Sequence, residues 1–299
     1  MPVKPVSTAT AFAIAALGIA LFSTMDAVMK GLAIGIGTYN ALLWRTMAGA
    51  VLGGIVFAAT RSGWPGRAAM RLHLTRGILS AAMAFLFFWG LARVPLAQAI
   101  ALSFVAPLIA LYLAAILLGE RIERRAILAS LLGFAGVLVI LSGQALATMG
   151  PDAFRGAIAI LISSGLYAYN IILMRRQALA AGPIEIAFFM SLIMSGCFLA
   201  VAPVLAVPPP AAQLPAIFGA AVLAFGSLML LSWAYARAEA QHLAPVEYTA
   251  FVWASRFGLV IFDEPVRPLT LAGAGMIVIA CLIAARRRGT QVPNVEGAV

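Results

Sequence analysis

The sequence predicts an all-α integral membrane protein with ten transmembrane helices, arranged as two inverted five-helix repeats. Of its 299 residues, 64% are hydrophobic and 10% are charged, and its mean hydropathy is +1.04. A soluble domain is about half apolar and a quarter charged. The apolar residues also recur in blocks of roughly 20, the length at which a helix crosses about 30 Å of hydrocarbon. These two observations predict the membrane class, and an internal repeat predicts the arrangement.

Ten apolar blocks give the predicted transmembrane spans. Connectors rich in Gly and Pro separate several of them, as at Gly63–Gly66 and Pro208–Pro210, because these residues interrupt helices. The polar residues 287–299 at the end of the chain predict a disordered cytoplasmic tail. The predicted spans are residues 8–30, 38–60, 73–92, 96–118, 124–143, 154–175, 183–206, 212–236, 241–262 and 268–285.

The basic residues predict the orientation. With the N-terminus in the cytoplasm, most of the 20 Lys and Arg residues fall in cytoplasmic connectors, and four lie on the opposite side: Lys30, Arg93, Arg155 and Arg267. Because basic residues gather on the cytoplasmic side of a membrane, both termini are expected there. Topology thus accounts for the net charge of +10, and no basic face typical of nucleic-acid binding is present.

The chain matches itself at an offset of 144 residues. Residues 89–93, which begin with Trp and end with Arg, align with residues 233–237, which do the same, and Glu120 aligns with Glu264. Matching Trp, Arg and Glu without a gap indicates a duplicated unit.

The duplication divides the chain into a first repeat, residues 8–143, and a second repeat, residues 154–286. Each repeat contains five predicted spans, which is an odd number, so the second must run through the membrane in the opposite direction. Inverted repeats place a solute site near the midplane and give two equivalent packings, open to opposite sides. This arrangement is typical of an alternating-access carrier.

With this repeat, the chain resembles the drug/metabolite transporter superfamily in its EamA-type ten-helix form. The resemblance covers residues 8–288 and rests on the duplicated unit, on Ala106-Pro107-Leu108, and on Leu117-Leu118-Gly119-Glu120 with its partner Glu264. The chain is most similar to the YddG-type amino-acid exporters of bacterial inner membranes. This resemblance implies export of small zwitterionic solutes, namely neutral and aromatic amino acids, across that membrane.

The second repeat departs from this pattern, since Phe251 stands where the first repeat has Pro107, and Asp263 where it has Gly119. These departures leave the substrate open. An exporter of drugs, nucleosides or other metabolites is the alternative, and a membrane-embedded enzyme acting on lipids is a remote one. The resemblance also implies that the last helix of each repeat forms a scaffold or dimer face, giving a monomer or weak homodimer.

Four ionisable residues lie well inside predicted spans, away from the span ends, where charge is expensive and usually functional. Asp26 and Arg45 are expected at similar depth, either as a structural ion pair or with Arg45 holding a substrate carboxylate. Glu247 is a candidate proton carrier or ammonium ligand, or else a partner for basic loops. Arg256 is expected to reach the interface or to pair with an acidic residue at the end of its span.

Aromatic and polar residues on the spans form the candidate cavity lining. Trp44 and Trp89 could instead belong to the interfacial aromatic belt, and the others could simply pack between helices. Pro107 lies within a span, where it removes a helical hydrogen bond, so we expect a kink and a hinge there. The cavity candidates are Trp44, Arg45, Phe85, Trp89, Ser103, Tyr167, Asn170, Tyr248, Phe251 and Trp253.

Motifs for metal, cofactor or catalytic chemistry are missing. His73 and His242 have no Cys or carboxylate cluster of metal-ligand spacing nearby in the sequence. No phosphate-binding glycine loop is present. We therefore expect no cofactor, no metal and no enzymatic activity.

Overall fold

The computed structural model describes residues 8–60, 63–118, 124–145, 150–178, 180–235 and 246–285, and these ranges contain helices and no β-strand. Five helices are long and apolar enough to cross a membrane: Thr10–Ile36, Thr38–Ala59, Arg67–Leu91, Pro151–Met174 and Ala211–Ala234. Shorter apolar helical stretches of 10–17 residues lie at Leu96–Ala110, which includes a break described below, and at Ser130–Gly143, Pro183–Leu199, Thr249–Phe262 and Pro268–Ile283. The predicted tail and the first residues of the ninth predicted span lie outside the described residues.

The described helices form two compact units. Unit 1 takes the residues up to Phe85 and Leu173–Ala250, and unit 2 takes Leu86–Ile172 and the residues from Phe251 onward. Each unit therefore contains helices from both halves of the sequence.

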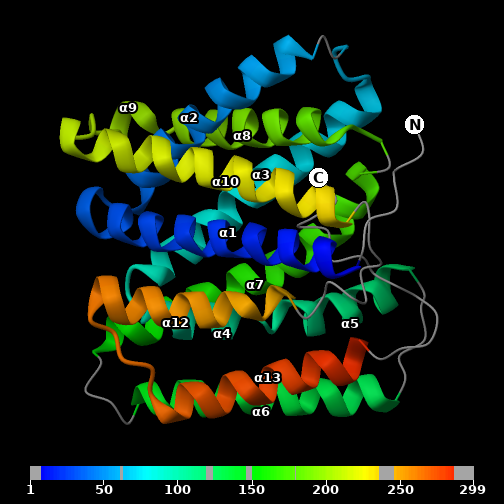
Figure 1. Ribbon diagram of the computed structural model, residues 1–299, viewed down its shortest axis with the longest axis vertical. Helices are drawn as coiled ribbons and strands as arrows, with labels where there is room; N and C mark the ends of the chain where they lie inside the picture. Colours follow the sequence, from blue (N-terminus) through cyan, green and yellow to red (C-terminus); the bar gives the residue numbers. More distant parts are fainter. Residues whose placement is uncertain are drawn as a thin grey trace. The chain divides into compact units, whose positions relative to one another are not determined.

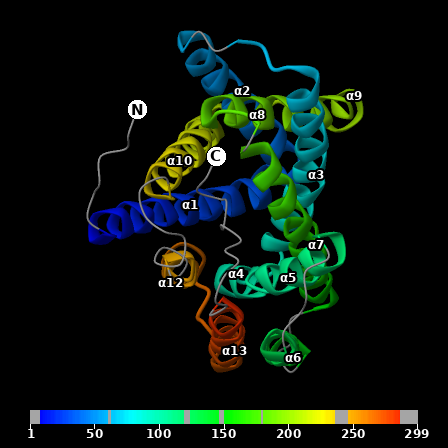
Figure 2. The ribbon, with the colours of Figure 1, turned by 90° about the vertical axis from the view of Figure 1, so that its right-hand side faces the viewer.

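Unit 1 is built on two antiparallel helix pairs. In the first pair, α1 lies along α10 (Figures 1 and 2), with Gly18 against Leu231 and Gly35 against Gln213. Gly37, at φ 79°, ends α1 and allows the sharp reversal into α2. The helices of unit 1 are α1 (Thr8–Ile36), α2 (Thr38–Ala59), most of α3 (Arg67–Leu91), the end of α7 (Pro151–Ala178), α8 (Pro183–Leu199), α9 (Ala202–Leu205), η1 (Ala211–Gln213) and α10 (Leu214–Tyr235).

The second pair of unit 1 joins α2 to α8. Gly49 packs on Ser191 and Gly53 on the backbone of Phe188, so rising numbers on one helix meet falling numbers on the other. The ring of Phe57 stacks on that of Phe188, with 5.1 Å between centroids. Small residues on α2 thus allow close approach, as is usual between helices in membranes.

Unit 2 is built on the antiparallel pair α6 and α13, which lie side by side in Figures 1 and 2. A Cβ on Gly136 would lie 2.7 Å from the carbonyl oxygen of Gly273, and one on Gly133 would lie 3.5 Å from Cβ of Ala280. Glycine is therefore required where these backbones meet. The helices of unit 2 are the end of α3, α4 (Leu96–Ser103), α5 (Ala106–Leu118), α6 (Arg124–Ala145), most of α7, α12 (Thr249–Phe262) and α13 (Pro268–Ala285).

The helix bounds recur at the sequence offset of 144. Adding 144 to the start of α6, residue 124, gives 268, where α13 begins, and adding it to the start of α3, residue 67, gives 211, where η1 leads into α10. Residue 38 of α2 gives 182, one before the start of α8. Two of these equivalent pairs, α2 with α8 and α6 with α13, pack antiparallel within their units.

The fourth predicted span is two helices, which corrects the expected single kinked helix. α4 ends at Ser103 and α5 starts at Ala106. Pro107 has no N–H, and its ring clashes with a carbonyl four residues earlier, here that of Ser103. The thiol of Cys281 donates to the carbonyl oxygen of Phe104 at this break, with 3.3 Å between the atoms. The chain therefore breaks where another helix offers a donor.

Three span boundaries also differ from the prediction. α3 begins at Arg67, six residues before the predicted start at residue 73. α1 continues to Ile36, so Lys30 lies within the helix instead of in an external connector. α8 ends at Leu199, not at residue 206, because Pro203 cannot continue the helix and would clash with the carbonyl of residue 199.

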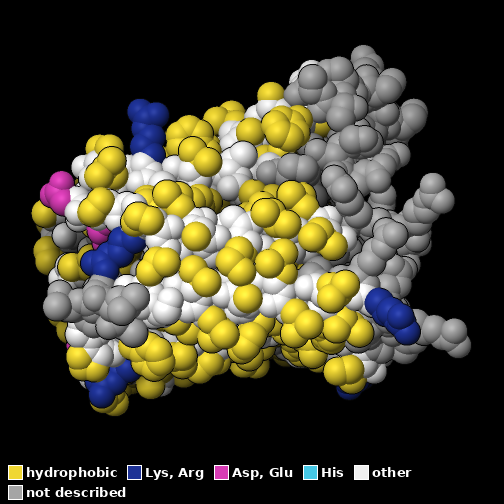
Figure 3. All heavy atoms as spheres, turned by 90° about the horizontal axis from the view of Figure 1, so that it is seen from below, with side chains coloured by type: hydrophobic (Ala, Val, Ile, Leu, Met, Phe, Trp, Pro, Cys, Tyr) yellow, Lys and Arg dark blue, Asp and Glu magenta, His cyan; other side chains and the backbone are white. Residues whose placement is uncertain are grey.

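The outer surface is apolar, as expected for contact with lipid. In Figure 3 hydrophobic side chains cover most of the visible face, and Lys and Arg lie near its margins. On α6 an outward stripe repeats at helical spacing, and its most exposed members, Leu128 and Leu131, are 65% and 62% exposed. Exposing such an apolar surface to water costs free energy, whereas exposing it to the hydrocarbon of a bilayer does not.

Candidate functional site

Three charged residues gather in the interior of unit 1. Asp26 and Lys30 lie one turn apart on the same face of α1, and each is only 2% exposed. Arg45, on α2, is half-buried and interacts electrostatically with Asp26. We call Asp26, Lys30 and Arg45 the charge cluster.

The turn at Gly37 explains why the charge cluster forms. Asp26 precedes this glycine by 11 residues and Arg45 follows it by 8. At about 1.5 Å per residue, both side chains therefore lie roughly 12–16 Å from the turn, at similar depth. Lys30, expected outside the membrane, instead lies between Asp26 and the turn because α1 is longer than predicted.

The start of α2 is fixed by hydrogen bonds to the segment after α8. Nε1 of Trp44 donates to the carbonyl oxygen of Val207 at 3.0 Å, and the amide of Val207 donates to Oδ1 of Asn40 at 2.9 Å. The hydroxyl of Tyr39 donates to the carbonyl oxygen of Phe198 at 2.6 Å. These bonds hold Trp44 and the start of α2 against the end of α8 and the segment that follows it.

Buried hydroxyl groups accompany the charge cluster in unit 1. Ser23 on α1, Ser80 on α3 and Ser227 on α10 are at most 4% exposed. Within the described part of the chain, their Oγ atoms have no hydrogen-bond partner. A buried polar atom without a protein partner usually contacts water or a ligand.

The other predicted site residues of unit 1 are less enclosed. Phe85 is 37% exposed. Glu247 and Tyr248 lie just before α12 and are half-buried.

In unit 2, Trp89 is covered by a cation. The guanidinium of Arg93 lies 3.6 Å from the centre of the Trp89 ring, and its NH1 donates to the carbonyl oxygen of Trp89 at 2.8 Å. The pair lies at the end of α3. A Trp ring covered by an arginine whose charged end reaches toward water is typical of the membrane–water interface.

Tyr167 and Asn170 lie on α7, one turn apart. Asn170 is 2% exposed. Tyr167 is half-buried and packs against a cluster of Ala110, Ala168 and Ile171. The polar groups of this face of α7 are therefore embedded in apolar surroundings.

Three predicted residues lie along α12. Phe251 and Trp253 are half-buried, and Arg256 is exposed. The ring of Trp253 stacks on that of Phe257, with 6.0 Å between centroids. Oε2 of Glu264, a residue expected to pair with Arg256, accepts a hydrogen bond from the amide of Leu96 at 2.8 Å.

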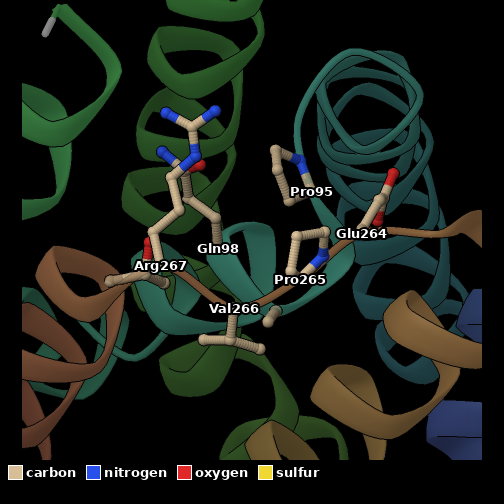
Figure 4. A pocket seen from close by; sticks show the side chains of 8 residues that line it. Pro95, Gln98, Glu264, Pro265, Val266 and Arg267 are labelled. Atoms are coloured by element: carbon tan, nitrogen blue, oxygen red, sulfur yellow. The ribbon is translucent and has the colours of Figure 1, made fainter. Parts of the chain in front are cut away.

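A small pocket lies where the segment after α12 meets the start of α4. In Figure 4, Gln98 and Arg267 lie on one side, and Pro95 and Glu264 on the other. Gln98 is 3% exposed, and its Nε2 has no partner among the described residues. The carboxylate of Glu264 also stabilises the positive end of α4.

Ser103 and Pro107 flank the break between α4 and α5. Oγ of Ser103 donates back to the carbonyl oxygen of Ala99 at 2.9 Å. Non-helical backbone at membrane depth occurs where protein or a cavity can satisfy it, so this break is a candidate hinge.

The predicted site residues divide between the two units. Asp26, Trp44, Arg45, Phe85, Glu247 and Tyr248 belong to unit 1, and Trp89, Ser103, Pro107, Tyr167, Asn170, Phe251, Trp253 and Arg256 belong to unit 2. Glu120 and His242 lie outside the described residues. Among the described residues, no group of three or more His, Cys, Asp and Glu side chains could hold a metal ion.

Sequence reasoning missed two features. Lys30 was placed in a connector because its predicted span ended there, although its four-residue spacing from Asp26 could have indicated a shared helical face. His73, for which no partner was predicted, has Oε1 of Glu185 at 2.9 Å from its Nε2. Glu185 lies near the start of a predicted span and could have been counted among the ionisable residues there.

Comparisons with known proteins agree with a membrane transporter. The model of the EamA-like transporter family matches residues 9–142 and again residues 154–286. The pseudopaline exporter CntI of Pseudomonas aeruginosa is 25% identical over 281 residues, covering 89% of this chain and 93% of that protein. An uncharacterized transporter of Helicobacter pylori is 28% identical over 204 residues, covering 67% and 68%.

A solved crystal structure shares the fold. Its TM-score is 0.62 at 21% sequence identity, and the match covers 94% of this chain and 100% of that one.

Proposed function

Because the chain belongs to the EamA-like transporter family and is a multi-pass membrane protein, we propose that it is a secondary carrier exporting small zwitterionic solutes. The solutes we propose are neutral and aromatic amino acids. The membrane is the bacterial inner membrane, with both termini in the cytoplasm. The basic residues in the connectors on that side support this orientation.

The observation that carries this proposal is the charge cluster. It contains two cationic groups, Lys30 and Arg45, and one carboxylate, Asp26. A charge is costly in an apolar interior unless it is paired. A solute carboxylate would fit the surplus of cationic groups, and the planar guanidinium of Arg45 suits two-point binding of it.

The rest of a zwitterion needs an acceptor for its ammonium group. Asp26 is the buried carboxylate of the cluster, and Ser23 lies about one turn away on the same helix. Ser23 and Ser227 also bring polar oxygens into the interior of unit 1. These groups supply the mixed donors and acceptors that an amino-acid backbone requires.

Aromatic residues are proposed to take the apolar part of the solute. Those of unit 1 are Phe85 and Tyr248, with Trp44 next to Arg45 in the sequence. A pocket wall of this kind discriminates by only about 1–3 kcal/mol per methylene, so we expect broad specificity among neutral amino acids.

We propose alternating access between two inverted repeats as the mechanism. Support comes from the antiparallel packing of α6 on α13 and of α2 on α8, the helices that the offset of 144 makes equivalent. It also comes from the break between α4 and α5, since discontinuous helices are typical of carriers.

Counterflow tests the proposal. The purified protein is reconstituted in liposomes loaded with unlabelled phenylalanine, and uptake of labelled neutral and aromatic amino acids is measured with and without a pH gradient. We expect accumulation of several of them. No accumulation of any amino acid, together with counterflow of labelled nucleosides or cationic drugs, would contradict the substrate class.

A second candidate is a carrier for a different small metabolite. The similarity to the pseudopaline exporter, over 93% of that protein's length, favours it. Counterflow of pseudopaline without counterflow of amino acids would select this alternative.

A further inference from the structure

Four polar side chains form a continuous chain of hydrogen bonds in unit 1. Arg76 and His73 lie on α3, Gln177 on the last turns of α7, and Glu185 on the first turn of α8. His73 and Gln177 are each 1% exposed, and Arg76 is 6% exposed. The side chain of Glu185 is 18% exposed. The chain therefore links three helices and reaches the surface only at its acidic end.

The direction of each hydrogen bond follows from Arg76. A guanidinium only donates, so Arg76 donates to Oε1 of Gln177. The amide NH2 of Gln177 then faces His73, and its Nε2 lies 2.6 Å from Nδ1 of the ring. Nδ1 must therefore be an acceptor. The ring proton is left on Nε2, where it donates to Oε1 of Glu185 at 2.9 Å.

This order permits one protonation state of His73. A second proton, on Nδ1, would point at the NH2 of Gln177, which is itself a donor. Turning the Gln177 amide would satisfy His73 but would place NH2 against Arg76, which has no acceptor. A protonated His73 and an intact Gln177 link are therefore incompatible.

One apolar ring covers the histidine. Phe189 stacks on it, with 4.9 Å between centroids, and the ring of Trp64 packs edge-on against Phe189 at 5.2 Å. Among the described residues, the charged groups facing His73 are Glu185 on α8 and, through Gln177, Arg76 on α3. The Glu185 carboxylate can accept the Nε2 proton in either protonation state of the ring, and its partly exposed position brings this end of the chain to the surface.

We propose that His73 is a proton-binding site of this transporter, and that a proton taken up from water by Nδ1 releases Gln177 and loosens α7 from α3 and α8. The proton adds to the ring lone pair, the imidazolium stays paired with the Glu185 carboxylate, and deprotonation restores the link. This inference rests on the transporter function but not on the solute. It therefore does not depend on the charge cluster.

Nitrogen NMR tests the proton site directly, because the chain has only two histidines. In a His242→Gln variant labelled with 15N-histidine, the one remaining signal is that of His73. We expect the neutral Nε2–H form at high pH and a single protonation step at Nδ1 on acidification. Adding Gln177→Leu removes the amide donor from Nδ1, so the neutral ring should no longer be restricted to the Nε2–H form. A neutral Nδ1–H form, or a ring that never protonates while the protein is folded, would overturn the proposal.

Hydrogen exchange tests the loosening of α7 without any solute. After correction for the intrinsic effect of pH, acidification should increase exchange in the last turns of α7 around Gln177 in the wild type and in the His242→Gln control. A His73→Asn variant should lose this pH response. Should it fail to fold, Gln177→Leu, which removes the link to Nδ1 itself, should likewise lose the pH response. Equal pH responses in the wild type and the variant would contradict the proposed release of Gln177.

Discussion

The charge cluster of unit 1 and the α6–α13 pair of unit 2 differ in what they bury: the first buries charged groups, and the second buries closely packed backbone. In unit 1, charged and hydroxyl groups are buried among apolar helices, at Asp26, Lys30 and Ser23 for example. In unit 2, Gly136 and Gly273 bring two backbones so close that no side chain fits between them. One region carries costly polar groups that are useful for binding, and the other gains its stability from close packing.

The contrast suggests that the charge cluster serves transport and that the α6–α13 pair serves stability. Buried charges inside a membrane protein usually belong to the path of a solute or ion. Small residues between helices support tight and lasting association. We therefore expect changes in unit 1 to affect transport first and changes at the α6–α13 pair to affect stability first.

The largest effect is expected from removing one charge of the cluster. Asp26→Asn keeps the shape of the side chain but leaves Lys30 and Arg45 without their carboxylate. Breaking a buried pair costs about 3–5 kcal/mol, and the partial exposure of Arg45 places this variant near the lower end. The melting temperature of the protein in detergent should fall, and so should the rate of phenylalanine counterflow.

The double variant Asp26→Asn with Arg45→Gln separates the two roles of this pair. Removing the guanidinium as well returns the cluster to one surplus cation, as in the wild type, and should recover part of the stability, whereas transport should stay lost. Recovery of transport as well would show that the pair is structural and does not bind solute.

The next largest effect is expected at Gly273. A Cβ there would lie 2.5 Å from the carbonyl oxygen of Gly136 and 2.5 Å from the side chain of Ile140. Gly273→Ala should therefore destabilise the protein by about 2 kcal/mol, as overpacked sites do. Gly275→Ala is the matched control, since nothing lies within 4 Å of its added Cβ. Equal melting temperatures for the two variants would contradict the packing described for unit 2.

The smallest effect is expected at Trp44. Trp44→Phe keeps the ring but removes the hydrogen bond to Val207, which contributes about 1 kcal/mol. Because that bond orients the residue next to Arg45, the Michaelis constant for phenylalanine should rise more than the maximal rate falls. A change in the maximal rate alone, measured by initial uptake at several concentrations, would argue against this orienting role.

The sequence predicted those features that depend on local residues, namely the positions of most helices and a distortion at a proline. The long apolar blocks predicted most helices to within a few residues, and the offset of 144 relates the bounds of α6 to those of α13. Pro107 predicted a distortion but not its extent, because a break also needs a neighbouring donor, here Cys281.

The sequence could not predict contacts between distant helices. His73 and Glu185 are 112 residues apart, and only the packing of α3 near α8 brings them together. Lys30 was misplaced because a charge was taken as the end of a span, whereas the buried helix continues beyond it. How the cavity candidates of the two units combine stays a prediction.

The most direct test of a carboxylate-binding cluster compares phenylalanine with phenylalaninamide, which lacks the carboxylate, as competitors in counterflow. Wild-type protein and an Arg155→Gln control, altered at an exposed arginine, should prefer phenylalanine by about 10–100-fold, the equivalent of a charged hydrogen bond of roughly 1.5–3 kcal/mol. Arg45→Gln should lose this preference while still inserting into the membrane. Undiminished discrimination by Arg45→Gln would contradict the account.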